Sequence, residues 1–211
     1  MERAKTVLII LLFIVLLVTA VAQSLTMVEL AIMAKEVTRM QNEGELLRFQ
    51  LEESRKFFKD AERLTGYIRR YRPRASEHEL NETALYIVFF AQKHQVDPIV
   101  VAAMIATESG FKRNAFGSAG ERGLLQVLPE TFIHWGKGNL DNWQDTLEAG
   151  IRYFAYLEQK YQGNIRLAIA AYNAGPGAVK AEVPVNSITQ RHVHRVMMAY
   201  RGVGRTLGRW N

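Results

Sequence analysis

The sequence contains no cysteine, which excludes disulfide bonds, a thiolate metal site and a cysteine nucleophile. It also lacks low-complexity tracts, internal repeats and the alternating apolar and polar runs typical of half-buried strands. The periodic segments that are present have helical spacing, so the compact part of the chain is predicted to be all-α or mostly α-helical. Apolar residues make up 48% of the 211 residues, which excludes a wholly disordered chain and allows a real core.

No histidine cluster supports a metal site. His192 and His194 are two positions apart, which on a helix points them to different faces. The net charge of +6 favours acidic partners such as nucleic acid, anionic lipid or the carboxylates of a bacterial cell wall, and charge alone does not choose among them.

Residues 1–22 have the pattern of a signal peptide or a membrane anchor. Arg3 and Lys5 precede an uncharged apolar run over 6–22, which is at the short end for a membrane helix. The small residues before Gln23 resemble a cleavage site, so cleavage and retention both stay open. In either case the basic residues favour a cytoplasmic N-terminus, and the rest of the chain is expected outside the cytoplasm.

Residues 23–70 are predicted to form one long helix with an apolar heptad seam. No proline occurs between Leu30 and Ile68, and the seam positions follow alternating steps of three and four. They are Leu30, Met33, Val37, Met40, Gly44, Leu47, Leu51, Ser54, Phe58, Ala61, Thr65 and Ile68. Two interpretations remain, a coiled coil that self-associates through 30–68 and a single helix docked on the rest of the protein.

Arginines surround Pro73 at 71–75, where the helical pattern breaks, so this basic segment is predicted to be a linker before a compact domain over 76–211. Within that domain, helix starts are predicted at three caps. Ser76 with Glu79 fits a capping box, Asp97 precedes Pro98, and Asn164 precedes a further short helix.

Glu108 is the strongest candidate for catalysis. The ten residues before it, from Pro98 to Thr107, are almost all apolar and predict a buried helix. Met104 and Ile105 would desolvate the carboxyl group, and the negative end of the helix dipole would also raise its pKa. A carboxylic acid that stays protonated near neutral pH is what glycosidic cleavage requires. From these residues alone, a glutamate turned to solvent at a helix end is an equally good interpretation.

Three linked motifs decide between the two interpretations. The segments ESGFKRNAFGSAGERGLLQVLPET (108–131) and AYNAGPGAV (171–179) contain Glu-Ser-Gly-Phe, Gly-x-x-Gly-Leu-x-Gln and Ala-Tyr-Asn-Ala-Gly in this order. On these motifs the chain resembles the lytic transglycosylase family typified by the soluble bacterial enzymes, over roughly 84–201.

The resemblance implies a goose-lysozyme-like helical domain that cleaves peptidoglycan between N-acetylmuramic acid and N-acetylglucosamine and leaves 1,6-anhydromuramyl ends. It implies no metal, no organic cofactor and no nucleic-acid partner. The expected location is the periplasmic side of a bacterial inner membrane, anchored or secreted, although a phage virion enzyme would tolerate the same organisation.

Carried over to this sequence, the motifs make Glu108 the catalytic acid and Ser109 its structural neighbour. Gln126, Tyr172 and Asn173 then become substrate-binding residues. Gly117 stands where a serine that contacts substrate is common, and Ser118 beside it is expected to substitute.

Other positions depart from the family pattern. Glu121 replaces a usual alanine, and Ile188 and His192 stand where a glutamate and a tyrosine are common. A second carboxylate at Glu121 would allow a hydrolytic lysozyme instead, because it could position a water. The simpler interpretation of Glu121 is a solvated loop residue. A third alternative for the protein is a non-catalytic wall-binding component of a secretion, conjugation or phage machine.

Overall fold

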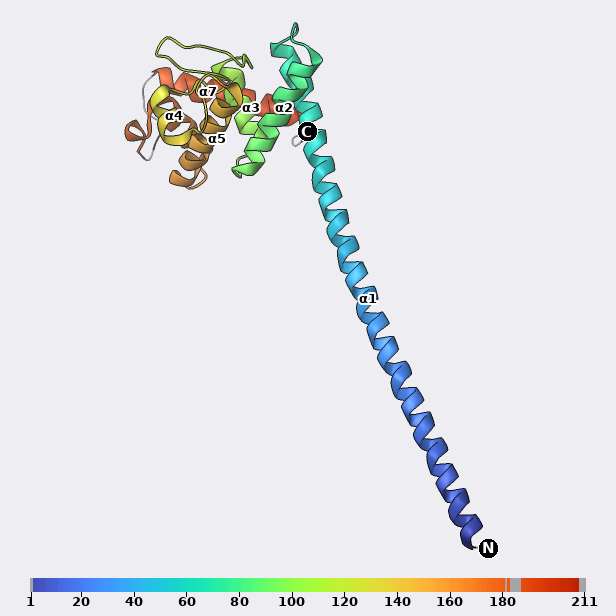
Figure 1. Cartoon of the computed structure of the whole chain (residues 1–211). Helices are drawn as coiled ribbons and strands as arrows, with labels where there is room; N and C mark the ends of the chain where they lie inside the picture. Colours follow the sequence, from blue (N-terminus) through green and yellow to red (C-terminus); the bar gives the residue numbers. More distant parts are fainter. Residues whose placement is uncertain (1, 181, 183–186, 209–211) are drawn as a thin grey trace. The chain divides into compact units, whose positions relative to one another are not determined.

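The described residues form seven α-helices, one short 3-10 helix and no β-strand, which confirms the all-α prediction (Figure 1). The computed structural model describes residues 2–180, 182 and 187–208, with the side chains of residues 2–8 and 187 excepted. The elements are α1 (Glu2–Tyr71), α2 (Glu77–Lys93), α3 (Pro98–Glu108), α4 (Pro129–Trp135), α5 (Trp143–Lys160), α6 (Ile165–Ala174), η1 (Pro176–Ala178) and α7 (Ser187–Thr206). The chain divides into two compact units, Met1–Ser54 and Arg55–Asn211.

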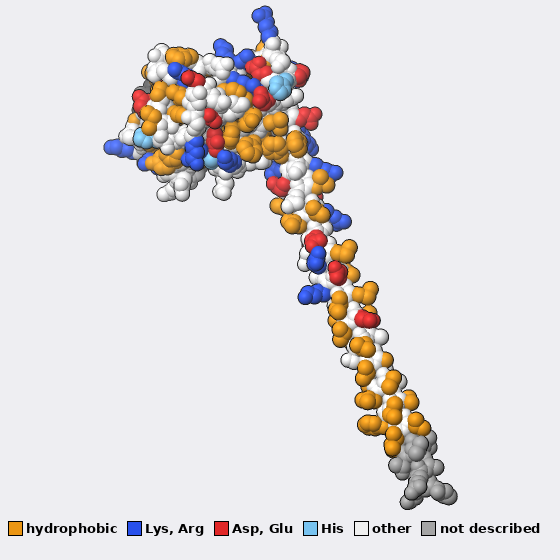
Figure 2. Space-filling model, viewed as in Figure 1, with side chains coloured by type: hydrophobic (Ala, Val, Ile, Leu, Met, Phe, Trp, Pro, Cys, Tyr) orange, Lys and Arg blue, Asp and Glu red, His pale blue; other side chains and the backbone are white. Residues whose placement is uncertain are grey.

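The first unit is the N-terminal part of α1. Its large apolar side chains are exposed without a break from Ile9 to Val18, and Figure 2 shows hydrophobic side chains gathered along this part of the helix. The helix contains an 18-residue window with a mean hydropathy of 2.5, none of it buried, and is therefore long and apolar enough to cross a membrane. Arg3 and Lys5, on which the predicted orientation depends, lie outside the residues whose side chains are described.

The last turns of α1 belong to the second unit. The buried apolar residues on these turns are Ala61, Leu64, Tyr67 and Ile68. Tyr67 and Tyr71 also pack their rings edge-on against Phe111, with centroids 6.1 and 5.3 Å apart. The compact unit thus begins at Arg55, earlier than the boundary predicted at 71–75, because one face of the helix completes the core of the domain.

The heptad seam is divided between two environments. Its N-terminal positions, such as Leu30, Val37 and Leu47, are exposed, whereas Ala61 and Ile68 are buried inside the second unit. The docked-helix interpretation therefore describes the seam from Ala61 onward. The large apolar seam positions before Ala61 are exposed and could pair with a second copy of the chain.

The basic segment after α1 is a tight turn. The backbone N–H of Arg72 donates to Ile68, and its guanidinium donates to the Phe111 carbonyl at 3.3 Å and pairs with Glu79 at 3.2 Å. These contacts join the turn to α1, to α2 and to the segment that follows α3. The segment predicted to be a linker is therefore part of the folded domain.

The three predicted helix caps are confirmed. Ser76 accepts a hydrogen bond from the backbone N–H of Glu79, Asp97 accepts one from Ile99, and Asn164 accepts one from Leu167. Side-chain oxygens at these positions satisfy N–H groups that have no partner within the helix. Local chemistry thus fixes where α2, α3 and α6 begin.

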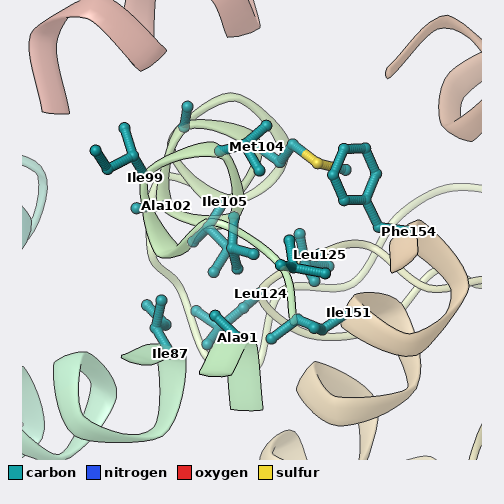
Figure 3. Close-up of a cluster of buried hydrophobic side chains, with 14 of the residues drawn as sticks. Ile87, Ala91, Ile99, Ala102, Met104, Ile105, Leu124, Leu125, Ile151 and Phe154 are labelled. Atoms are coloured by element: carbon teal, nitrogen blue, oxygen red, sulfur yellow. The ribbon is translucent and has the colours of Figure 1, made fainter. Parts of the chain in front are cut away.

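Helix α3 lies in the centre of the core, where every residue from Pro98 to Ile105 is buried. Figure 3 shows its side chains surrounded by those of α2, α5 and the segment between α3 and α4. The labelled neighbours are Ile87, Ala91, Leu124, Leu125, Ile151 and Phe154. Because α3 is buried up to Ile105, the position of its last turn is set by the core.

Candidate active site

Glu108 is the last residue of α3, and the chain turns sharply after it. Gly110 and Phe111 adopt φ values of 58° and 62°, in the left-handed region that ends a helix. Ser109 donates its hydroxyl to the Leu124 carbonyl at 2.8 Å. This hydrogen bond ties the end of α3 to the segment that carries Gln126, which agrees with the structural role expected for Ser109.

The carboxyl group of Glu108 is mostly removed from solvent, with 18% of its side chain exposed. Burial raises the pKa of Glu108 from 4.5 to about 7, and the negative charge of Glu121 adds to the rise, while Arg195 opposes it. The pKa of Glu108 is therefore raised, as the sequence predicted. Near neutral pH a substantial fraction of Glu108 carries the proton that a general acid needs.

His192 of α7 is the side chain that faces Glu108 directly. Its Nε2 lies 3.4 Å from Oε1 of Glu108, and the residue is only 3% exposed. Burial, with a smaller effect of Arg195, lowers the pKa of His192 to about 4, so the ring is uncharged near neutral pH. Sequence reasoning found no support for His192 as a metal ligand, noted it as a departure from the family pattern and did not assign it to the site.

Glu121 fills a space that the glycine at 117 leaves open. Its Oε2 accepts a hydrogen bond from the backbone N–H of Ala119 at 2.8 Å. A Cβ at position 117 would collide with this carboxylate and would lie 3.0 Å from Oε1 of Gln126. Gly117 is thus required for the place that Glu121 occupies, which brings Glu121 and Gln126 together beside position 117.

Gln126 has a backbone φ of 48°, in the left-handed region that non-glycine residues seldom adopt. Its side-chain amide donates to the Gly123 carbonyl at 3.0 Å, and its backbone N–H donates to the same carbonyl at 3.2 Å. The first bond fixes the amide group, and the second holds the backbone turn that carries it. Such strain is typical of positions held for a function.

Tyr172 lies on α6 with its ring against Tyr153, at a centroid distance of 5.3 Å. Its hydroxyl donates to the Leu125 carbonyl at 3.0 Å and not to Glu108. Burial raises the pKa of Tyr172 and Glu108 adds to the rise, which places the phenol within electrostatic reach of the acid. The sequence motifs assigned Tyr172 to substrate binding, and in the structure its hydroxyl has a backbone partner.

The remaining two predicted residues are more peripheral. Asn173 is exposed, and its Oδ1 accepts a hydrogen bond from the Thr189 hydroxyl of α7 at 3.2 Å. Ser118 is exposed in the turn that the Gly120 N–H closes onto Gly117. Among the described residues, no hydrogen bond joins Ser118 to Glu108 or Gln126. The structure thus gathers Glu108, His192 and Tyr172, with Glu121 within electrostatic reach of Glu108.

Comparison with known proteins identifies relatives of this domain. The family model of the transglycosylase SLT domain matches residues 86–210. Membrane-bound lytic murein transglycosylase C of Haemophilus influenzae is 29% identical over 134 residues, which cover 51% of this chain and 38% of that protein. Membrane-bound lytic murein transglycosylase F of Pseudomonas syringae is 31% identical over 93 residues, covering 41% and 19% of the two chains. The chain therefore spans well under half the length of these relatives.

Two solved structures share the fold. An inactive mutant of the lytic transglycosylase Slt from Pseudomonas aeruginosa has 26% sequence identity and a TM-score of 0.51. The 70 kDa soluble lytic transglycosylase from Escherichia coli has 22% identity and a TM-score of 0.54. Each match covers 58% of this chain and 24% of the other.

Proposed function

Because the chain belongs to the transglycosylase SLT domain family, we propose that it is a lytic transglycosylase that cleaves the glycan strands of peptidoglycan. The observation that carries the proposal is the carboxyl group of Glu108, at the end of a helix that is buried from Pro98 to Ile105, with a pKa raised to about 7. The sequence motifs around it and the relatives named above support the same substrate.

In the proposed mechanism, Glu108 acts first as an acid and then as a base. Its protonated carboxyl group donates a proton to the oxygen between N-acetylmuramic acid and N-acetylglucosamine as that bond breaks. The resulting carboxylate accepts the proton of the muramyl C6 hydroxyl, whose oxygen attacks the anomeric carbon. One carboxyl group is sufficient, and the product is a 1,6-anhydromuramyl end.

We propose substrate contacts for the polar side chains that the sequence motifs indicated. Gln126 presents a fixed amide, Asn173 an exposed one, and Ser118 an exposed hydroxyl. We assign Tyr172 to the wall of the site, because its hydroxyl has a backbone partner. Sugars have hydroxyl and acetamido groups along both edges, so polar side chains of this kind suit them.

Hydrolysis remains the second candidate, because Glu121 carries a second carboxylate whose charge reaches Glu108. Against hydrolysis, Oε2 of Glu121 accepts a hydrogen bond from the Ala119 N–H, and the carboxylate lies against Gly117. A carboxylate held in this way is poorly suited to activate a water.

Product chemistry separates the two enzymatic candidates. We expect mass spectrometry of muropeptides released from purified sacculi to show anhydromuramyl ends, lighter by one water than the reducing ends that a lysozyme leaves. Muramyl ends that borohydride reduces would contradict the transglycosylase assignment and favour Glu121. Absence of any turnover would favour the non-catalytic wall-binding component.

Activity should fall as the pH rises through about 7, because Glu108 must carry a proton to act as the acid. Initial rates on sacculi between pH 5 and 9 would measure this alkaline limb of the pH–activity profile. Glu121→Gln should move the limb to lower pH, since it removes a negative charge that raises the pKa of Glu108. An unchanged or higher midpoint in this variant would contradict the coupling.

The raised pKa of Glu108 also affects the stability of the fold. Because the pKa of Glu108 is higher in the folded state than its ordinary value of 4.5, the associated stabilisation is complete below about pH 4.5. It is lost as the pH rises through about 7, and it amounts to about 3 kcal/mol. Thermal unfolding at each pH of the activity series therefore separates loss of catalysis from loss of fold.

We further propose that residues 6–22 anchor the enzyme in a bacterial inner membrane, with the catalytic unit on the periplasmic side. The exposed apolar side chains from Ile9 to Val18 suit a lipid environment. Self-association, predicted through 30–68, is restricted by the burial of Ala61 and Ile68. The segment we propose for pairing with a second copy is therefore the exposed part of the seam, 30–58.

A further inference from the structure

The imidazole of His192 is buried, and one of its two nitrogens has no hydrogen-bond partner among the described atoms. Its Nε2 is shielded from solvent and, among the described atoms, has no partner with hydrogen-bond geometry. Oε1 of Glu108 lies 3.4 Å from this nitrogen. Because an unpaired buried nitrogen costs free energy, its presence inside the domain requires an explanation.

Helix α7 holds this ring in a fixed position. Val193 and Val196 are buried on the face that carries His192, and α7 packs against both α3 and α6. Thr189, one turn before His192, donates to Asn173 of α6. The ring is thus fixed relative to the end of α3, and a small adjustment of the Glu108 side chain would shorten 3.4 Å to an ordinary hydrogen bond.

We propose that His192 is the positioning residue of the catalytic acid, donating Nε2–H to Oε1 of Glu108 and leaving Oε2 to exchange the proton with substrate. The inference rests on the proposed function of Glu108. In the neutral form with hydrogen on Nε2, the ring can donate to the carbonyl oxygen of the acid and equally to the carboxylate that follows proton transfer. One contact then holds the carboxyl group through both steps.

The chemistry of histidine suits this task better than that of a cation. A permanently charged partner at this distance would lower the pKa of Glu108 and leave it ionised. Burial keeps the pKa of His192 near 4 and that of Glu108 near 7, so both groups are uncharged between these values. His192 can therefore orient the carboxyl group of Glu108 and still leave it protonated near neutral pH.

Two other ionisable side chains act on the pair, and the pKa of a third responds to it. Arg195 of α7 lowers the pKa of both groups, and Glu121 raises that of Glu108. Tyr172 of α6 is an uncharged phenol whose own pKa is raised in part by Glu108. Among the described residues, none of these three forms a hydrogen bond with Nε2 of His192, so substitution of His192 tests the ring itself.

The test compares the variants His192→Gln and His192→Asn, each made in the whole 211-residue chain and purified in detergent. The amide of His192→Gln reaches about as far as Nε2 and can donate, whereas the amide of His192→Asn is shorter and matches Nδ1. We expect His192→Gln to keep kcat on sacculi within about threefold. His192→Asn and His192→Leu should lose about tenfold to a hundredfold in kcat with little change in KM.

The pH profile distinguishes positioning from an ion pair. With His192→Gln, the alkaline limb near pH 7 should not move, because no charge has been removed. A limb shifted to higher pH would mean that a charged His192 had stabilised the carboxylate, and would overturn the proposal. Wild-type kcat in His192→Asn would also overturn it.

A direct measurement covers the case in which the asparagine and leucine variants do not fold. Nitrogen-15 NMR of the wild-type ring at pH 6 should show a neutral imidazole with hydrogen on Nε2. A charged ring, or hydrogen on Nδ1 alone, would refute the inference. Failure of the proposed function would be seen separately, as wild-type chain without sacculus turnover or Glu108→Gln with full activity.

Discussion

Replacing Glu108 by glutamine is expected to lower sacculus turnover by at least about a thousandfold, because the amide has the shape of the acid but no proton to transfer. The fold should be retained, since the last turn of α3 is held by the buried residues before Glu108 and by the hydroxyl of Ser109. Release of soluble muropeptides would be measured against co-sedimentation with sacculi, which should persist.

The matched control for this variant is Glu121→Gln, the same chemical change at the neighbouring carboxylate. At pH 6 it should keep most of the activity, because the single-acid mechanism does not use Glu121. Glu108→Gln should also be more stable than the wild type at pH 8, where the buried carboxylate is ionised. Turnover above about a tenth of wild type in Glu108→Gln would remove this residue from its role.

Deleting the end of α1 should unfold the catalytic domain. A fragment over 76–211 follows the boundary predicted from sequence, but it lacks the four core residues of the last turns, which are Ala61, Leu64, Tyr67 and Ile68. Full burial of a leucine or isoleucine contributes about 1.5 to 3 kcal/mol. The summed loss, about 5 to 10 kcal/mol, is comparable with the whole stability of an ordinary domain. Circular dichroism and urea unfolding would measure it.

The control fragment is 55–211, which contains every buried position of α1 and starts where the compact unit starts. It should unfold cooperatively and retain sacculus turnover. If 76–211 were equally stable, the turns from 61 to 68 would be an accessory contact and not a part of the core.

Helical content and the buried helix could be predicted because both depend on local patterns. An apolar run between Asp97 and Glu108 predicts a buried helix with a capped start, and the structure has both. The raised pKa of Glu108 followed from the same reasoning, since a carboxyl group on such a helix is desolvated wherever the rest of the chain lies.

The features that were missed depend on residues far apart in the sequence. No periodicity indicates that His192 meets Glu108, because that contact depends on how α7 crosses α3. Nor does any local signal show that the Tyr172 hydroxyl donates to Leu125. The arginines around Pro73 suggested a linker, while the decisive contacts of Arg72 are made to Phe111 and Glu79.

The space shared by Gly117 and Glu121 makes their substitutions conditional on each other. A side chain at position 117 would displace the Glu121 carboxylate from the Ala119 N–H, and a glutamate at 121 can take its present place only over a glycine. A mutation that is tolerated at one position will therefore depend on the residue already present at the other. Among homologous sequences these two positions should vary as a correlated pair, with an ancestral change to glycine at 117 preceding the arrival of the carboxylate.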